Sequence, residues 1–398
     1  RPRRAGSTSE GRRLWSEQDA VPCGTRALGM RPAIWHCGCM TLRHGDARLA
    51  GDVTALLAGP RGRRLGLEYA ATIDPEIQQL MFWLAYRAAP ENSTLLRFDD
   101  GTDDPDDPDV TVADLVALIA ANSFDESDDS VARTALRAAV DAAMYWQSPD
   151  GADLVAALPA VRTSLIPIAE ALLSSPVGAA WQSARTSEQW AVDWRAAEDA
   201  APLPSNVGTL VAAGDQSERE EEARAARERP RDPEARWSGS WWSVPASTLS
   251  TREHVADALE LIEDDFGPEV ATVIPVRGTG RVLEITSARD WAELCRAFPL
   301  EVTASRRHDW YRVTGRDGRW LIPAWSRVAL EWDAVHLTTF GYLSAATSLI
   351  KIDEEYASVI GGWAPDATYW LNDTARESSE PRQHWARPSA SGEWTRES

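Results

Sequence analysis

A charged, proline-containing stretch over residues 201–236 divides this sequence into two halves that differ in hydrophobic period. Of the 22 residues from Asp215 to Arg236, 14 are charged, and positive and negative charges are mixed. Mixed charges at helical spacing support a short solvated helix, which Pro230 and Pro233 would end. We therefore predict a semi-rigid linker over residues 201–236, between one domain before it and one after it.

The half before the linker has the period of α-helices. The clearest examples are a helix from Pro75, expected to be buried on all sides, and an amphipathic helix that begins near Asp129 and Ser130. Weaker helical stretches cover residues 111–122, 160–174 and 178–198. Residues 46–200 are therefore predicted to form an all-α bundle able to contact a protein partner.

The half after the linker mixes strands with helices. We predict a hairpin from strands 270–276 and 281–285, then a helix from about Ala288. Further strands are predicted at 301–305, 309–313, 319–322, 334–339 and 368–371. Because the two kinds of element do not alternate regularly, we predict an α+β domain over residues 237–373 and the α+β class for the whole chain. Twelve of the 19 tryptophans lie after residue 236, ten of them within this domain, so indoles must fill its core or line a ligand surface.

The two ends of the sequence differ from the rest. Residues 1–45 carry eight arginines against three acidic residues, a local charge of +5 where the remainder carries −25. We predict a disordered leader or a mis-called start there. Residues 374–398 are polar and are predicted to form a frayed tail.

Composition excludes several classes of function. The net charge of −20 disfavours general nucleic-acid binding and attraction to anionic membranes, since both need a positive field. Lys351 is the only lysine, and its surroundings fit neither a Walker phosphate loop nor a Schiff-base site. With only four cysteines and no run of eighteen apolar residues, the sequence predicts a cytoplasmic protein without a membrane span.

Three candidate sites are better explained as ordinary structure. Zinc ligand types occur near the N-terminus at Cys23, His36, Cys37, Cys39 and His44, but their spacing is poor, so no metal is predicted. The acidic run over residues 99–109 lacks the calcium-loop pattern and is expected to be a solvated loop. Cys295 lies on the inward face of a predicted helix, where burial would leave its thiol inert.

A basic and aromatic cluster around residues 305–320 carries +3 within this acidic protein. Arginine binds phosphate or carboxylate in a bidentate manner, and Trp or Tyr stacks on a base, so the cluster suits an anionic or nucleotide-like ligand. The candidate ligand-binding residues are Arg306, Arg307, His308, Trp310, Tyr311 and Arg312. The alternative is structural, with the arginines paired to the protein's own carboxylates.

His336 is a candidate acid, base or hydrogen-bond donor. In an alternating strand it shares one face with Thr338, and Glu331 precedes the strand. The alternative is a structural histidine, satisfied by a backbone carbonyl or by Glu331 or Asp333.

The C-terminal half also resembles known proteins. The strings that carry the resemblance are Val302-Thr-Ala-Ser-Arg-Arg-His-Asp-Trp-Tyr311, Trp332-Asp-Ala-Val-His-Leu-Thr338, Gly341-Tyr-Leu343, Gly362-Trp363 and Thr368-Tyr-Trp-Leu371. They resemble an uncharacterised protein family of high-GC actinobacteria, a resemblance that implies no activity. The domain is also faintly similar to ADP-ribosyltransferase-like domains. That similarity would cast Arg281, His308 or His336, Tyr311 and Glu331 in catalytic roles.

Two functions follow as hypotheses. The first is a binding or regulatory protein, without a cofactor, whose C-terminal domain recognises a small anionic or nucleotide-like ligand. The alternative is an NAD-cleaving, ADP-ribosyltransferase-like enzyme with His336 and Glu331 as catalytic residues.

Overall fold

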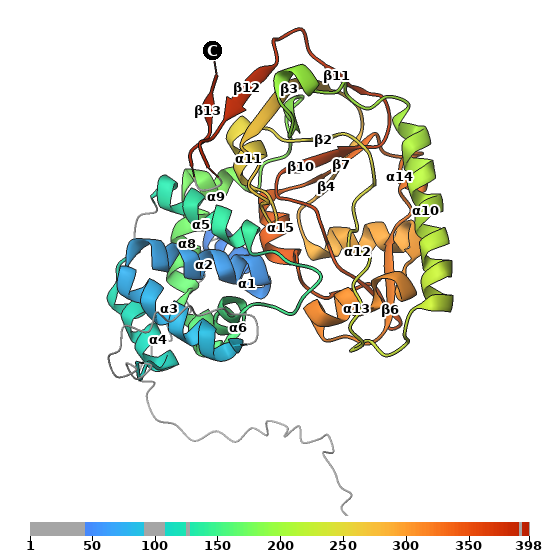
Figure 1. Ribbon diagram of the computed structural model, residues 1–398. Coiled ribbons are helices and arrows are strands. Elements are labelled where there is room, and N and C mark those ends of the chain that lie inside the picture. The colour runs from blue at the N-terminus through green and yellow to red at the C-terminus, as the bar shows by residue number, and fades with distance from the viewer. Residues whose placement is uncertain (1–43, 91–107, 125–127, 390–391, 398) are drawn as a thin grey trace, which may run out of the picture. The chain divides into compact units, whose positions relative to one another are not determined.

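The computed structural model describes residues 44–90, 108–124, 128–389 and 392–397. Its N-terminal half is helical, as predicted, and its helices gather together in Figure 1. They are α1 (His44–Ala58), α2 (Pro60–Ile73), α3 (Pro75–Ala88), α4 (Val112–Ala121), α5 (Asp129–Asp141), α6 (Gly151–Ala157), α7 (Pro159–Ser164), α8 (Ile166–Ser174) and α9 (Pro176–Ala180).

The remaining chain contains three small sheets. The first has the order β1-β3-β12-β13, and β11 also pairs with β3; its strands are β1 (Glu188–Asp193), β3 (Val270–Gly278), β11 (Ala375–Glu377), β12 (Gln383–Ala386) and β13 (Thr395–Arg396). The second has the order β2-β10-β7-β4, with β2 (Ser250–Thr251), β10 (Ala367–Trp370), β7 (Ala334–Leu337) and β4 (Val282–Ile285). The third has the order β5-β6-β9-β8, with β5 (Pro299–Glu301), β6 (Arg319–Pro323), β9 (Tyr356–Ser358) and β8 (Ile350–Lys351).

Further helices accompany these sheets: a 3-10 turn (Ala197–Asp199), α10 (Val207–Glu228), α11 (Val255–Glu260), α12 (Ala288–Ala297), α13 (Thr303–Thr314), α14 (Trp325–Val328) and α15 (Thr339–Ala345). The α+β class is thus confirmed. Among the described residues no single helix is long and apolar enough to cross a membrane; α6 passes such a test only jointly with α7 and α8, across a 70° bend.

The described residues from His44 onward pack as one compact unit, with a core shared by the helical and the α+β halves. Leu56 and Leu65 of the first helices belong to the same buried cluster as Leu343 of α15. The buried guanidinium of Arg61 also donates hydrogen bonds to the Ala139 carbonyl and to Oγ1 of Thr347, at 3.0 and 3.2 Å.

Two helical predictions in the first half are wrong. Helix α3 is not buried on all sides, because Phe82 is 49% exposed and only Ile77 and Leu84 are fully covered. The stretch 178–198 is not a helix, because α9 ends at Ala180 and β1 follows it. Trp190 and Val192 of β1, and Trp194 just after it, alternate with other residues in the manner of a strand.

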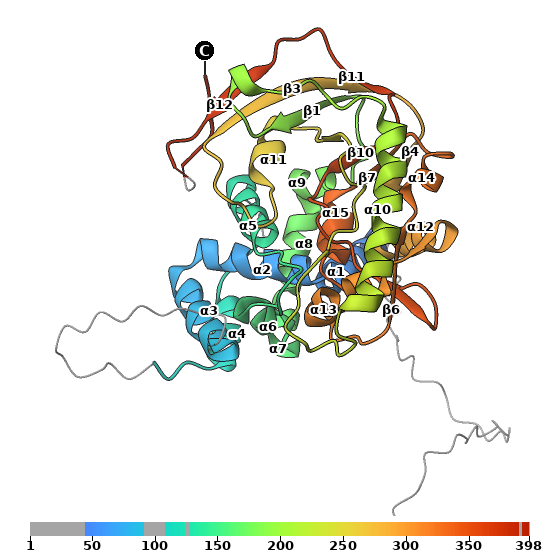
Figure 2. The same cartoon turned by 45° about the vertical axis from the view of Figure 1, so that its right-hand side comes forward.

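The predicted linker contains a helix, as expected, but the helix is not a solvated spacer. Helix α10 packs along α13 and α14, as both views show (Figures 1 and 2). Buried Asp215 accepts hydrogen bonds from the backbone at the start of α14, and Glu222 accepts them at 2.8 Å from Ala304 and Ser305 of α13. The carboxylates of α10 thus cap the first turns of α13 and α14, where negative charge is favourable.

The strands predicted at 301–305 and 309–313 are wrong, because helix α13 covers most of this stretch. Burial follows a helical period, but several of the buried side chains are polar, among them Ser305, Arg306 and Asp309. Hydrophobic periodicity therefore could not reveal the helix. Gly315, in the left-handed region at φ 71°, ends it.

The predicted hairpin and the predicted frayed tail are also wrong, for one shared reason. Strand β3 pairs with β1 along one edge and with β11 and β12 along the other. The tail therefore joins the sheet, and no edge of β3 remains for β4, which pairs with β7 in parallel.

Candidate ligand-binding site

A cavity of about 740 Å³ is lined by residues of β1, β2, β10, α11 and several of the loops between elements. Seven aromatic side chains line it: Trp146, Trp190, Trp194, Trp241, Trp242, Phe266 and Tyr369. Other tryptophans, such as Trp363 and Trp370, are fully buried in the core, whereas Trp242 is 46% exposed. The tryptophan excess therefore serves both a core and a cavity of a size suited to a small organic ligand.

The aromatic side chains that line the cavity form what we call the aromatic wall, and part of this wall is already stacked. Trp241 stacks on Tyr145 with 5.3 Å between ring centroids and 8° between planes, and on Trp242 at 4.3 Å and 28°. Gly362 makes this packing possible, because a Cβ there would lie 2.5 Å from Cδ1 of Trp242. Gly362 also has φ 73°, a conformation that side chains rarely adopt.

Arg252 supplies a positive charge to the cavity wall. Its backbone exchanges hydrogen bonds of 2.7 and 2.8 Å with Trp190, which places the two side chains next to each other. Its guanidinium donates to Oγ of Ser250 at 3.3 Å, and its buried Nε has no partner among the described residues. No described carboxylate forms an ion pair with Arg252, and burial lowers its pKa. It is therefore available to an anionic group of a ligand.

Glu263 places a carboxyl group on the same cavity. Burial raises the pKa of Glu263 to about 7, although the hydroxyl of Tyr145 donates a hydrogen bond of 2.6 Å to its Oε1 and opposes this shift. The carboxyl group therefore changes its protonation state near neutral pH and can accept or donate a hydrogen bond there.

The raised pKa of Glu263 predicts a pH-dependent stability. Because the folded pKa lies above the ordinary value of 4.5, the folded state binds a proton more tightly than the unfolded one, and Glu263 destabilises the fold increasingly as pH rises from 4.5 to about 7. Replacing Glu263 with Gln should remove this loss. Urea unfolding should thus show the variant gaining stability relative to the wild type between about pH 5 and about pH 8.

The exposed Glu269 provides the matched control. Glu269→Gln should show a difference from the wild type that stays constant over the same pH range. A constant difference for Glu263→Gln would contradict the prediction.

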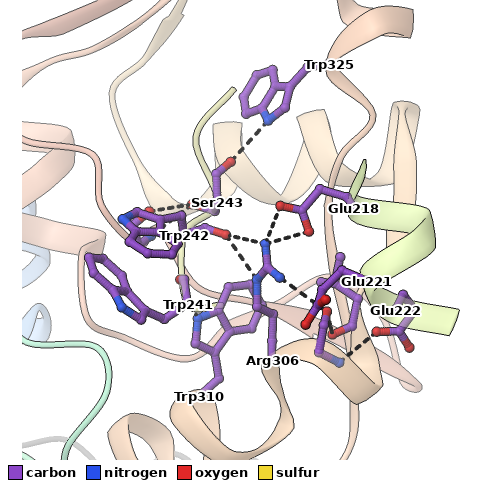
Figure 3. A network of polar contacts seen from close by, with 12 residues as sticks. Glu218, Glu221, Glu222, Trp241, Trp242, Ser243, Arg306, Trp310 and Trp325 are labelled. Atoms are coloured by element: carbon purple, nitrogen blue, oxygen red, sulfur yellow. Dashed lines mark hydrogen bonds and ion pairs between the residues drawn. The ribbon is translucent and has the colours of Figure 1, made fainter. Parts of the chain in front are cut away.

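The structure brings the predicted ligand residues of 306–312 together on α13 but turns them toward the protein. Arg306 is fully buried and donates to both carboxylate oxygens of Glu218, each at 2.8 Å (Figure 3). Tyr311 donates to Glu234 at 2.9 Å, and Arg307 to the Pro230 carbonyl at 3.0 Å. His308 is buried, and neither ring nitrogen has a partner among the described residues.

This cluster instead supports the aromatic wall through hydrogen bonds to the backbone of its residues. Arg306 donates to the Trp242 carbonyl at 2.9 and 3.1 Å (Figure 3). Trp310 Nε1 donates to the Trp241 carbonyl, and Arg312 to the Trp146 carbonyl, each at 3.0 Å. All three carbonyls belong to residues that line the cavity. The α13 residues therefore act as supports, and structural pairing is the reading that their geometry favours.

His336 and Glu331 are not brought together. The His336 ring is buried between Glu284, which its Nδ1 contacts, and Asp366, 3.1 Å from its Nε2. Burial opposes the charged imidazole, but hydrogen bonds to these carboxylates outweigh it and raise the pKa of His336. Glu331 is exposed, so the proposed catalytic pair has no assembled geometry.

The other candidates are settled in part. The acidic run, apart from its last residues, and the cysteines near the N-terminus lie outside the described residues. Within the described ranges no group of three or more His, Cys, Asp or Glu side chains is placed to hold a metal. Cys295 is buried, and burial raises the pKa of its thiol to about 12, as expected of an inert core cysteine.

Sequence reasoning missed the cavity residues Arg252 and Glu263. Two signals were available: the doublet Trp241-Trp242, and the alternation of Trp190, Val192 and Trp194 inside a stretch interpreted as a helix. Arg252 and Glu263 carried no local signal, because loops bring them to the site.

No family model, no curated protein and no solved structure matches this chain.

Proposed function

We infer that this protein binds a small organic ligand that carries an aromatic ring system and an anionic group. The observation that carries this proposal is Arg252, which lies in the tryptophan-lined cavity without an ion-pair partner in the part of the chain that the structure describes. A guanidinium that is partly desolvated binds phosphate or carboxylate in a bidentate manner, and indoles stack on planar rings. The ligand class remains anionic or nucleotide-like, but its site is this cavity and not α13.

Glu263 adds a second selective group. Its carboxyl group lines the cavity, where it interacts with the hydroxyl groups of Tyr145 and Tyr342 and can also meet a ligand. A ring with an amino or hydroxyl substituent suits it, because a buried carboxylate needs a donor. The preformed stack of Trp241 on Tyr145 means that the wall is already in place for a ring.

Titration calorimetry of the full chain with 4-methylumbelliferone and with 4-methylumbelliferyl phosphate tests this proposal. These probes share one planar ring and differ in the phosphate. The wild type should bind the phosphate more tightly. Arg252→Gln should weaken phosphate binding by about tenfold or more, since hydrogen bonds to charged groups contribute about 1.5–3 kcal/mol, and should change binding of the parent ring by less than about twofold.

The control variant is Arg289→Gln, at a side chain 84% exposed on α12 and away from the cavity lining. It should bind both probes like the wild type. Failure of the wild type to bind either probe would overturn the proposal. So would an equal loss for both probes in Arg252→Gln, because that would indicate a disturbed fold and no anion contact.

A further inference from the structure

A second cavity, of about 660 Å³, adjoins the first one. Trp190 lines both. The chain passes between them, because Arg252 lines the first cavity and the next two residues, Glu253 and His254, line the second. The two cavities therefore lie on either side of this short stretch of chain and share Trp190 in their linings.

Two polar atoms in the lining of this second cavity are buried and have no hydrogen-bond partner among the described residues. They are Nε2 of Gln189 and Oγ1 of Thr374. Gln189 is only 1% exposed, and its Oε1 already accepts a hydrogen bond from Thr251, which fixes the amide with Nε2 as a free donor. Buried polar groups are almost always paired, so these two atoms point to a missing partner.

The charges around them narrow the chemistry of that partner. The carboxylates of Glu188, Glu253, Glu377 and Glu380 outnumber the guanidiniums of Arg277 and Arg376 in the lining. An anion would therefore meet a negative field, and a simple cation would leave the Gln189 donor without an acceptor. A hydroxyl group both donates and accepts, so several hydroxyls satisfy carboxylates, guanidiniums and the amide together.

We propose that the second cavity binds a polyhydroxylated, sugar-like group of the same ligand whose ring occupies the aromatic cavity. This inference rests on the proposed function. The ligand is then an aromatic glycoside or nucleoside-like compound that passes Trp190, with its ring on one side and its hydroxyls on the other.

Calorimetry of the full chain with 4-methylumbelliferone and its glucoside, galactoside and mannoside tests the second cavity. At least one glycoside should bind about threefold to tenfold more tightly than the parent ring, the gain expected from one or two net hydrogen bonds. Thr374→Val and Gln189→Glu should each remove most of this gain. The first deletes the unpaired hydroxyl, and the second replaces the free donor but keeps the acceptor for Thr251.

Thr163→Val, at an exposed position on α7, is the matched control and should keep the gain. If the parent ring binds but no glycoside binds more tightly, this inference is wrong and the proposed function stands. A gain that both cavity variants retain would also overturn it. If neither the parent ring nor any glycoside binds, the proposed function and this inference fail together.

Discussion

Replacing Trp363 with alanine is expected to lower the free energy of unfolding by about 3–5 kcal/mol, as for other large-to-small changes of buried aromatic residues. Trp363 is fully buried and packs edge-on against Trp291 at 5.7 Å and against Tyr369 at 4.8 Å between ring centroids. Its Nε1 also donates to the Ala367 carbonyl at 3.0 Å, a hydrogen bond that the variant loses. Urea unfolding followed by circular dichroism measures the effect.

Trp237, which is 40% exposed, provides the matched control. Trp237→Ala should cost less than about 1 kcal/mol, because little packing is lost at an exposed side chain. Equal destabilisation by the two variants would contradict the assignment of Trp363 to the core.

Replacing Glu218 with alanine is expected to lower the free energy of unfolding by about 3 kcal/mol. The change leaves the guanidinium of Arg306 fully buried and without its carboxylate partner. Since Arg306 also holds the Trp242 carbonyl, the aromatic wall should shift as well. Calorimetry should then show weaker binding of 4-methylumbelliferone, in addition to the loss of stability.

Glu220 lies on the same helix with an exposed side chain and, among the described residues, accepts a side-chain hydrogen bond only from Gln216. Glu220→Ala should therefore change stability by less than about 0.5 kcal/mol and leave binding unaltered. If Glu218→Ala behaves in the same way, the ion pair with Arg306 does not support the wall.

The sequence predicted the fold class and many elements because these follow a local hydrophobic pattern. The face of α12 with Trp291, Leu294 and Cys295 is an example, since every member of the pattern is apolar and buried. Helix α13 was missed because Arg306 and Asp309 are buried polar residues, and their partners lie far away in the chain. Burial of a charged residue depends on a tertiary partner, which no local pattern contains.

The same limit applies to the candidate site. Arg306, Arg307 and Arg312 were predicted to bind a ligand because they are clustered in the sequence. Clustering in the sequence does not indicate whether these side chains point toward a cavity or toward the rest of the protein. Arg252 stands alone in sequence and becomes notable only because Trp190, 62 positions earlier, pairs with it across strands. The residues that line a cavity built from loops are therefore close together in the structure but scattered along the sequence.

The central place of β3 in its sheet also bears on how the chain is synthesised. One neighbour, β1, leaves the ribosome before β3, whereas β11 and β12 come more than ninety residues later, close to the C-terminus. Until then one edge of β3 has its backbone donors and acceptors unpaired, which invites association with other chains. Completion of this sheet must therefore wait until residues 375–386 have been synthesised, because β11 and β12 pair with the second edge of β3.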